Sequence, residues 1–184
     1  LKRLLAYSSI GHMGYALAGL ATGALEGYKS SIVYIAIYVV MNIGVFSCLY
    51  LMKKDGEYKE KISDLSGISK KHPLLAISFL ILLFSLAGIP PLGGFFAKFY
   101  VFSSVLEQEM YTLAIVGLLT TVISAVYYLK IIKTIYFDEN KLSFDVVNNR
   151  TISGTILISC TLLITFFLYP SFLSKIVSSL FAIN

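Results

Sequence analysis

The sequence LAGIPPLGGFFAKFYVF, residues 86–102, places two adjacent prolines, two adjacent glycines and one lysine inside a long apolar segment. That segment covers residues 73–106, and Lys98 is its only charged residue. A straight α-helix of this length would measure about 51 Å, whereas the hydrocarbon core of a bilayer is about 30 Å thick. The segment therefore predicts a helix that is interrupted inside a membrane.

The interruption is predicted at the Gly-Ile-Pro-Pro sequence. Pro90 and Pro91 lack amide hydrogens, and their rings clash with the preceding helical turn. Gly88, Gly93 and Gly94 allow dihedral angles that other residues avoid. Carbonyl groups freed by the break need new partners, so such a helix is tolerated only where it is buried in protein or lines a wet cavity.

The composition indicates a membrane protein. Only 14% of the 184 residues are charged, whereas a soluble domain has roughly 25%. Five long apolar segments cover residues 4–25, 30–52, 73–106, 110–129 and 151–174, and each is near or above the roughly 20 residues that a membrane-spanning helix needs. We predict an all-α, polytopic transmembrane helix bundle of five spans, the third one broken, as part of a single membrane domain over residues 1–184. A membrane β-barrel is excluded, because its strands alternate over about 10 residues.

The basic residues indicate the orientation of the bundle. If each segment crosses once, twelve of the 15 Lys and Arg residues lie on one side, two on the other, and Lys98 lies within a span. The twelve are Lys2, Arg3, Lys53, Lys54, Lys59, Lys61, Lys70, Lys71, Lys130, Lys133, Lys141 and Arg150. This bias predicts that the Lys-rich side is cytoplasmic, or the matrix side in a mitochondrion. The net charge of +5 is thus an orientation signal, and no nucleic-acid partner is predicted.

Lys98 is the first candidate site residue. Eight residues, FYVFSSVL, separate it from Glu107, so its backbone starts about 12 Å below the membrane surface. Placing a lysine near the centre of a spanning helix costs roughly 2.5 to 3.5 kcal/mol, and such residues usually face an interior pathway. Because burial disfavours the charged form, a buried lysine can accept and release protons near neutral pH. We interpret Lys98 as a proton-transfer residue; a structural ion-pair partner or a surface-reaching anchor is the alternative.

His12 is the second titratable group within a predicted span. It is a candidate proton relay, with a hydrogen-bonded packing residue as the alternative. Ser8, Tyr15 and Asn42 complete a candidate polar pathway, although hydrogen bonding between helices also explains Asn42.

Metal and cofactor sites are not predicted in this chain. Cys48 and Cys160 both lie inside predicted spans, and neither belongs to a CxxC or Cys/His pattern. The loops are too short for a soluble catalytic domain, so any chemistry takes place in the membrane.

Three stretches resemble a known family. LKRLLAYSSIGHMGY, SDLSGISKKHPLLA and LAGIPPLGGFFAKFYVF, which begin at residues 1, 63 and 86, are similar to parts of the antiporter-like membrane subunits of NADH:quinone oxidoreductase (respiratory complex I), subunit N or chain 2 in particular. The resemblance extends from residue 1 to about residue 137. It implies that the chain is the C-terminal portion of a longer protein, namely the last five of about fourteen helices. In the family this portion starts on the cytoplasmic side, which agrees with the lysine distribution.

The resemblance also implies a function. In the family, the lysine at the position of Lys98 takes part in proton transfer, so the chain would be a proton-translocating subunit of the oxidoreductase. Some relatives have a lysine near the position of Asn42. Because this chain has asparagine there, the second titratable site must be supplied elsewhere, which makes His12 a stronger candidate for it. NADH, FMN, iron–sulfur clusters and a quinone would be used by other subunits. The expected surroundings are other complex I membrane subunits and lipid, in the bacterial inner membrane or, alternatively, the mitochondrial inner membrane.

Two other functions stay open at this point. A subunit of a multisubunit sodium/proton antiporter would share the broken helix and the lysine, and neighbouring genes would distinguish it. A nonfunctional or purely structural remnant is the second alternative, which recovery of the upstream coding sequence would test.

Overall fold

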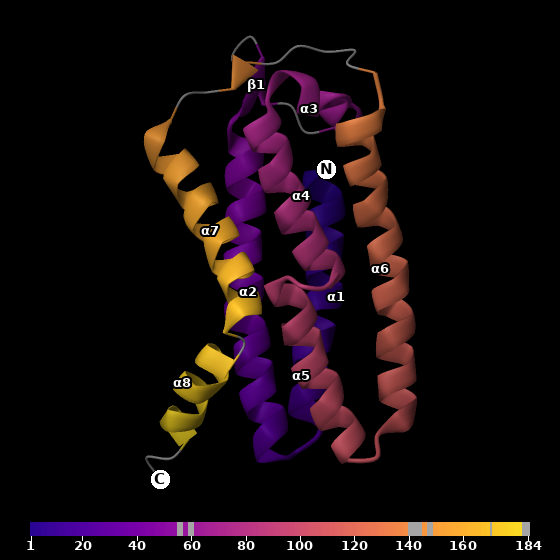
Figure 1. The fold of residues 1–184 in the computed structure, drawn as a ribbon. Helices are drawn as coiled ribbons and strands as arrows, with labels where there is room; N and C mark the ends of the chain where they lie inside the picture. The colour runs from indigo at the N-terminus through magenta and orange to yellow at the C-terminus, as the bar shows by residue number, and fades with distance from the viewer. Residues whose placement is uncertain (55–56, 59–60, 140–144, 147–148, 170, 182–184) are drawn as a thin grey trace.

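The computed structural model describes residues 1–54, 57–58, 61–139, 145–146, 149–169 and 171–181. These residues are mostly helical, and the long helices run side by side (Figure 1). The helices are α1 (Lys2–Ala21), α2 (Leu25–Tyr50), α3 (Ile68–Lys71), α4 (Pro73–Ala87), α5 (Gly93–Glu107), α6 (Tyr111–Phe137), α7 (Arg150–Leu168) and α8 (Ser171–Phe181), with a 3-10 helix, η1, at Ile62–Leu65.

A small antiparallel sheet, which was not predicted from the sequence, lies at one end of the mostly helical bundle (Figure 1). Its strands are β1 (Met52–Lys54), β2 (Glu57–Tyr58) and β3 (Asp145–Val146), in the order β2-β1-β3. Lys53 pairs with Tyr58 on one side and with Asp145 on the other. Strands of two or three residues carry no hydrophobic periodicity, so the sequence pattern does not reveal them.

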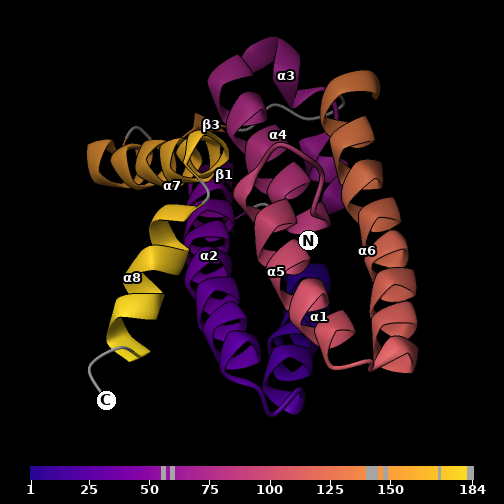
Figure 2. The ribbon, with the colours of Figure 1, turned by 60° about the horizontal axis from the view of Figure 1, so that its bottom comes forward.

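Helix α2 forms the centre of the bundle and contacts α1, α4, α5 and α7. Helices α6 and α7 lie on opposite sides of the bundle in both views (Figures 1 and 2). Small residues allow close packing around α2, since a Cβ atom on Gly44 would lie 2.4 Å from a methyl group of Leu82. Phe79, Leu82 and Leu83 of α4 are fully buried against this centre.

The long apolar segment around the prolines forms two helices, α4 and α5. Gly88 follows α4 with φ +82°, and its amide donates to the carbonyl oxygens of Phe84 and Ser85. This left-handed residue is a common helix ending that glycine adopts without steric cost. The peptide bond between Pro90 and Pro91 is cis, and α5 begins at Gly93.

The helix ends differ from the predicted span ends. Helix α1 ends at Ala21, before the predicted residue 25, and α2 already begins at Leu25. Helix α6 continues to Phe137, beyond the predicted residue 129. The predicted span ends were placed where charged residues begin, and this marks only the apolar middle part of a helix. Helices α2 and α6 continue through charged residues near their ends, such as Glu26 and Lys130.

The last predicted span, 151–174, is divided in the structure. Helix α7 ends at Leu168, and α8 starts at Ser171. Pro170, the expected helix breaker, lies outside the described residues.

Two of the described helices, α2 and α6, are long and apolar enough to cross a membrane by length and composition. Helices α4 and α5 have 15 residues each, fewer than the roughly 20 that a single crossing requires. Helix α1 has 20 residues but includes Ser8, Ser9 and His12, which lower its apolar character. Length and composition alone therefore identify fewer crossings than the five predicted spans.

Candidate functional site

Lys98 lies on α5 and is buried, with 5% of its surface exposed. Its ammonium donates to the carbonyl oxygen of Ala87 at 3.1 Å and to that of Leu86 at 3.4 Å. The ammonium also lies 4.9 Å from the ring centroid of Tyr15, over the ring, where the negative face of an aromatic ring attracts a cation. Lys98 is therefore held at the end of α4 by two carbonyl groups and one aromatic ring.

The two prolines explain why these carbonyl groups are available. In a continuous α-helix, the carbonyl of Leu86 would accept from the amide at position 90, and that of Ala87 from the amide at position 91. Both positions are proline and have no amide hydrogen. Lys98 supplies donors to the two carbonyl groups that the prolines leave without helical partners.

The glycines at the break bring α4, α5 and Lys98 close together. A Cβ atom on Gly88 would lie 2.9 Å from Cδ of Lys98, and one on Gly94 would lie 1.8 Å from the carbonyl oxygen of Ser85. The amide of Gly94 donates to the Ser85 hydroxyl at 3.0 Å. At Gly93, a Cβ atom would lie 3.2 Å from a methyl group of Leu163 in α7.

His12 lies in the middle of α1, with 2% of its surface exposed. Its Nδ1 hydrogen-bonds to the hydroxyl of Tyr34 at 2.7 Å, and its Nε2 to that of Tyr128 at 3.2 Å. The ring stacks on Tyr38, with centroids 4.7 Å apart. It also meets the edge of the Tyr15 ring at 6.1 Å, so Tyr15 contacts both His12 and Lys98.

Three of the tyrosines around His12, namely Tyr34, Tyr38 and Tyr128, were not predicted as site residues. Tyr34 and Tyr38 are four residues apart on α2 and therefore lie on one helix face, which is the signal that the sequence offers. Tyr128 comes from α6, far away in the sequence, and no local pattern connects it to His12.

Ser8 and Tyr15, two residues of the predicted pathway, do belong to this network. The Ser8 hydroxyl hydrogen-bonds to that of Tyr128 and accepts from the Tyr127 hydroxyl at 3.2 Å. The Tyr15 hydroxyl accepts from Thr121 at 2.9 Å.

Asn42, the third residue of the predicted pathway, is placed differently. It is half-buried on α2. Within the described part of the chain, no hydrogen bond or ring contact joins Asn42 to His12 or Lys98. The structure thus brings Ser8 and Tyr15 to the two titratable residues and leaves Asn42 outside their network.

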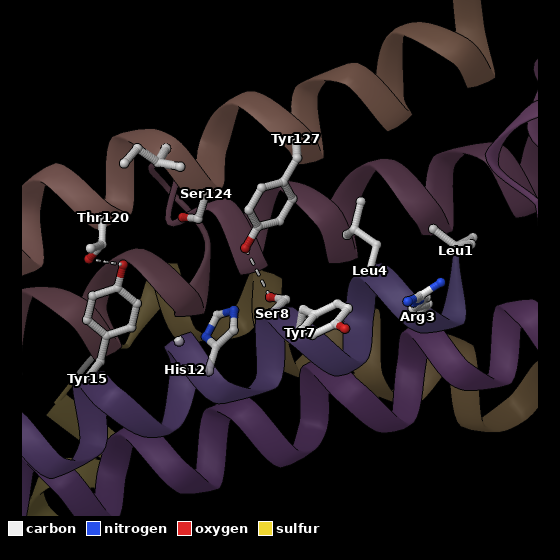
Figure 3. Close-up of a pocket in the computed structure, with 12 residues that line it drawn as sticks. Leu1, Arg3, Leu4, Tyr7, Ser8, His12, Tyr15, Thr120, Ser124 and Tyr127 are labelled. Carbon is white, nitrogen blue, oxygen red and sulfur yellow. Dashed lines mark hydrogen bonds between the residues drawn. The ribbon is translucent and has the colours of Figure 1, made fainter.

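A cavity of about 560 Å³ lies between α1 and α6, beside this network. Figure 3 shows Ser8, His12 and Tyr15 from α1 facing Tyr127 and Thr120 from α6. Arg3 lies at the end of the cavity nearest the start of α1. The cavity therefore extends from His12 toward the end of the bundle that the lysine distribution predicts to be cytoplasmic.

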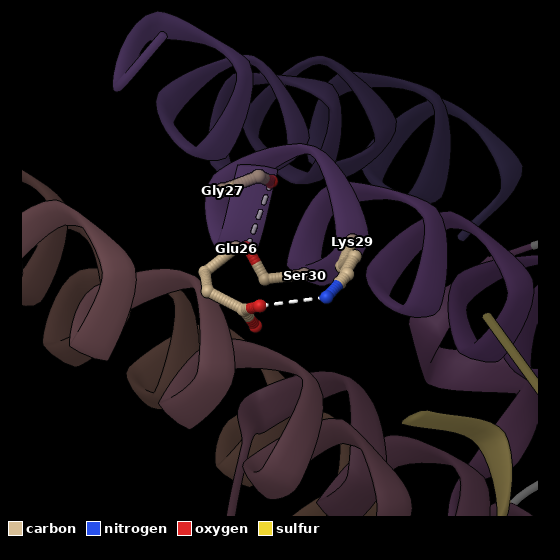
Figure 4. Close-up of polar contacts among 4 residues, drawn as sticks. All are labelled: Glu26, Gly27, Lys29 and Ser30. Carbon is tan, nitrogen blue, oxygen red and sulfur yellow. Dashed lines mark hydrogen bonds and ion pairs between the residues drawn. The ribbon is translucent and has the colours of Figure 1, made fainter. Parts of the chain in front are cut away.

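A smaller cavity of about 140 Å³ lies at the opposite end of the bundle and is lined by Glu26, Lys29, Ser30, Ser104 and Glu107, among others. Figure 4 shows the pair of Lys29 and Glu26, joined at 2.7 Å, next to Ser30. The hydroxyl of Ser30 lies 3.2 Å from that of Ser104. Ser104 follows Lys98 by six residues, or about 9 Å along α5, so polar groups are present on both sides of Lys98.

The side chains of this network are hydrogen-bonding groups. Ammonium, imidazole and hydroxyl groups each donate or accept hydrogen bonds. The hydroxyl groups of Tyr34 and Tyr128 lie 2.7 and 3.2 Å from the ring nitrogens of His12.

In the described residues, no group of three or more His, Cys, Asp or Glu side chains could hold a metal ion.

Comparisons with known proteins identify the family. The model of the family described as "NADH:quinone oxidoreductase/Mrp antiporter, TM" matches residues 1–124, so the chain belongs to this family of membrane proteins. The chain is 62% identical to "NADH-quinone oxidoreductase subunit N" of Pelagibacter ubique, over 97% of this chain and 38% of that protein. It is 46% identical to the protein of the same name in Rhodospirillum rubrum, over 93% of this chain and 35% of that protein. The family resemblance seen in the sequence is thereby confirmed, and the chain spans little more than a third of these relatives.

Solved structures share the fold. "Respiratory complex I from Thermus thermophilus with bound NADH" contains a chain with a TM-score of 0.80 and 26% identity, matched over 97% of this chain and 38% of that chain. A chain of the "Mrp complex from Dietzia sp. DQ12-45-1b" matches with a TM-score of 0.76 over 94% of this chain and 40% of that chain. At 19% identity the second match shows a common fold only. The predicted membrane helix bundle of antiporter-like type is therefore confirmed.

Proposed function

We propose that this chain is part of a proton-translocating membrane subunit of NADH:quinone oxidoreductase. NADH oxidation and quinone reduction take place in other subunits, which use the NADH, FMN, iron–sulfur clusters and quinone of the complex. The observation that carries the proposal is the burial of Lys98 against the carbonyl groups of Leu86 and Ala87 at a helix break. The relatives named above, which share the name of this oxidoreductase, support it.

The proposed arrangement has five membrane spans in one antiporter-like domain. Helices α1, α2, α6 and α7 each form one span, and α4 with α5 forms the broken third span. Each half has 15 residues and is about 22 Å long, so the two halves together cross the roughly 30 Å hydrocarbon core. The Lys-rich end faces the cytoplasm. The relatives are bacterial, which favours the bacterial inner membrane, where the partners are other membrane subunits of the complex and lipid.

In the proposed mechanism, Lys98 changes its charge state as a proton passes. His12 and the hydroxyl groups of Tyr128, Tyr127 and Ser8 form a relay toward the cavity between α1 and α6. Tyr15 touches both titratable residues, so a movement of its ring controls the transfer between them. Moving one charge through the membrane potential requires about 2.3 kcal/mol per 100 mV. The redox reaction in the other subunits must supply this energy by changing the electrostatic surroundings of Lys98.

Substitution of Lys98 in the full-length subunit tests the proposal. We expect Lys98→Ala to impair NADH-driven acidification of proteoliposomes while the complex still assembles, as judged on a native gel. Lys133→Ala is the matched control, because Lys133 is an exposed lysine at the end of α6, and it should pump normally. Normal pumping by an assembled Lys98→Ala complex would show that this residue does not carry the proton.

A sodium/proton antiporter subunit is the second candidate, because the family description and one shared fold include the Mrp antiporter. The identity of 62% to a protein named as an oxidoreductase subunit favours the first candidate. The neighbouring genes distinguish them, since each complex has its own set of additional subunits.

A further inference from the structure

A groove lies between α4 and α7. It is separate from the two cavities described above and from the Lys98 and His12 network. It has a volume of about 640 Å³, within the roughly 300 to 1,000 Å³ of typical ligand pockets. Its wall includes Lys71 and His72 at one end and Ile81 and Ile164 at the other. The groove therefore has a basic end and an apolar end.

The length of the groove matches one leaflet of a bilayer. Along α4, the lining extends from His72, the residue just before the helix, to Ile81, and on α7 it extends from Ser153 to Ile164. These distances correspond to about 14 and 17 Å of helix, close to half of a hydrocarbon core of about 30 Å. In the proposed membrane orientation, the groove runs from the cytoplasmic surface to the middle of the membrane.

The mouth of the groove is positively charged. Lys71 lines it, and Arg150, the first residue of α7, lies one helical turn before the lining residue Ser153 on the same side of the helix. Helices α4 and α7 both begin here, so the positive ends of two helix dipoles point to the mouth. None of the described residues that line the groove is acidic.

The body of the groove is an apolar surface. Leu74 and Leu157 are 81% and 68% exposed. The hydroxyl of Ser78 donates to the carbonyl of Leu74 at 2.9 Å, and the thiol of Cys160 donates to the carbonyl of Ser78 at 4.0 Å. Because these two polar groups are used by the backbone, the wall presents mainly methylene and methyl groups to an occupant, together with the side chains of Ser153 and Thr161.

We propose that this groove binds an acidic phospholipid of the cytoplasmic leaflet. One acyl chain lies along α4 and α7, and the phosphate group lies at Lys71 and Arg150. An uncharged lipid would fill the apolar part but would gain nothing from the basic mouth, so charge complementarity selects an anionic headgroup. The inference rests on the membrane orientation given under the proposed function, and it does not depend on proton transfer by Lys98.

Photolabelling of the full-length protein in its complex tests the site. The complex is placed in phosphatidylcholine vesicles that contain a trace of phosphatidylglycerol with a diazirine on one acyl chain, and labelled peptides are mapped by mass spectrometry. The same diazirine chain on phosphatidylcholine is the comparison probe. We expect phosphatidylglycerol to label α4 and α7 more strongly than phosphatidylcholine does. Lys71→Gln should lower that labelling about fivefold, the effect of one basic residue near a membrane surface.

Lys133→Gln, at the same end of the bundle on α6, is the matched control and should leave the labelling unchanged. Equal labelling of α4 and α7 by the two lipids, or no effect of Lys71→Gln, would overturn the proposal, because the groove would then contact bulk lipid without selecting it. Absence of lipid labelling, with crosslinks to another subunit in its place, would also overturn it. Neither result bears on pumping by Lys98, which the proteoliposome assay measures separately.

Discussion

Gly94→Ala is the substitution that most directly tests the packing at the helix break. The new methyl group would lie 1.8 Å from the carbonyl oxygen of Ser85, whereas real Cβ atoms essentially never approach another heavy atom within 3.0 Å. Helix α5 must therefore move away from α4 by more than an ångström, because the obstacle is backbone and not the flexible end of a side chain. The movement also strains the hydrogen bond from the Gly94 amide to Ser85.

The displacement should affect both stability and function. Forcing an extra methyl group into a packed interface costs about 1 to 3 kcal/mol. Lys98 follows Gly94 by one helical turn, so it moves with α5 away from the carbonyl of Ala87, which it now contacts at 3.1 Å. A misplacement of about 1 Å at a reacting group can lower a rate about 100-fold. We therefore expect a lower thermal midpoint together with a large loss of proton pumping.

Gly154→Ala on α7 is the matched control, since no described atom beyond its chain neighbours and its own helix backbone lies within 4 Å of the position that its Cβ would occupy. The same chemical change there should stabilise the helix by about 0.4 to 1 kcal/mol, because alanine loses less entropy on folding than glycine. The assay is the thermal midpoint of the purified full-length protein, combined with pumping in proteoliposomes. If Gly94→Ala were as stable and as active as Gly154→Ala, the close approach of α4 and α5 would not exist as described.

Three further outcomes are expected. Lys98→Arg should abolish pumping in an assembled complex, because a guanidinium group keeps its proton at any relevant pH; retained pumping would exclude a change of charge at this position. His12→Ala should reduce pumping less than Lys98→Ala does, and unchanged pumping would leave His12 with a packing role. Asn149→Ala removes the side chain that accepts from the amides of Thr151 and Ile152 at the start of α7, so it should lower the thermal midpoint by the equivalent of about 1 kcal/mol without affecting pumping; an unchanged midpoint would mean that this cap contributes nothing.

The helix break and its lysine were readable from the sequence because the underlying rules are local. Proline removes a donor and glycine permits a left-handed turn, so Pro90 and Gly88 mark the interruption without knowledge of the fold. A charged residue in a long apolar segment is conspicuous for the same reason. The sequence does not show which side chain from another helix lies against Lys98. In the structure, the Tyr15 ring lies under the ammonium of Lys98.

The surroundings of His12 were harder to predict. The chain has 13 tyrosines, and tyrosine is common in membrane helices. Only contacts between distant helices select Tyr34 and Tyr128 as the partners of the imidazole. Asn42 illustrates the converse, since its polarity made it a candidate but its position on α2 does not bring it to the network.

The partners of Lys98 also explain why a broken helix suits the charge change that the proposed mechanism assigns to this residue. The described groups in contact with its ammonium, two carbonyl oxygens and one aromatic ring, are all neutral. A carboxylate in their place would favour the charged lysine strongly and would hold its proton. An apolar site would offer no partner, and the buried charge would then be very costly. The carbonyl groups of Leu86 and Ala87 lie between these extremes, and they are available only because Pro90 and Pro91 cannot donate to them. The two prolines thus create a site of intermediate strength, which is what the proposed proton transfer by Lys98 requires.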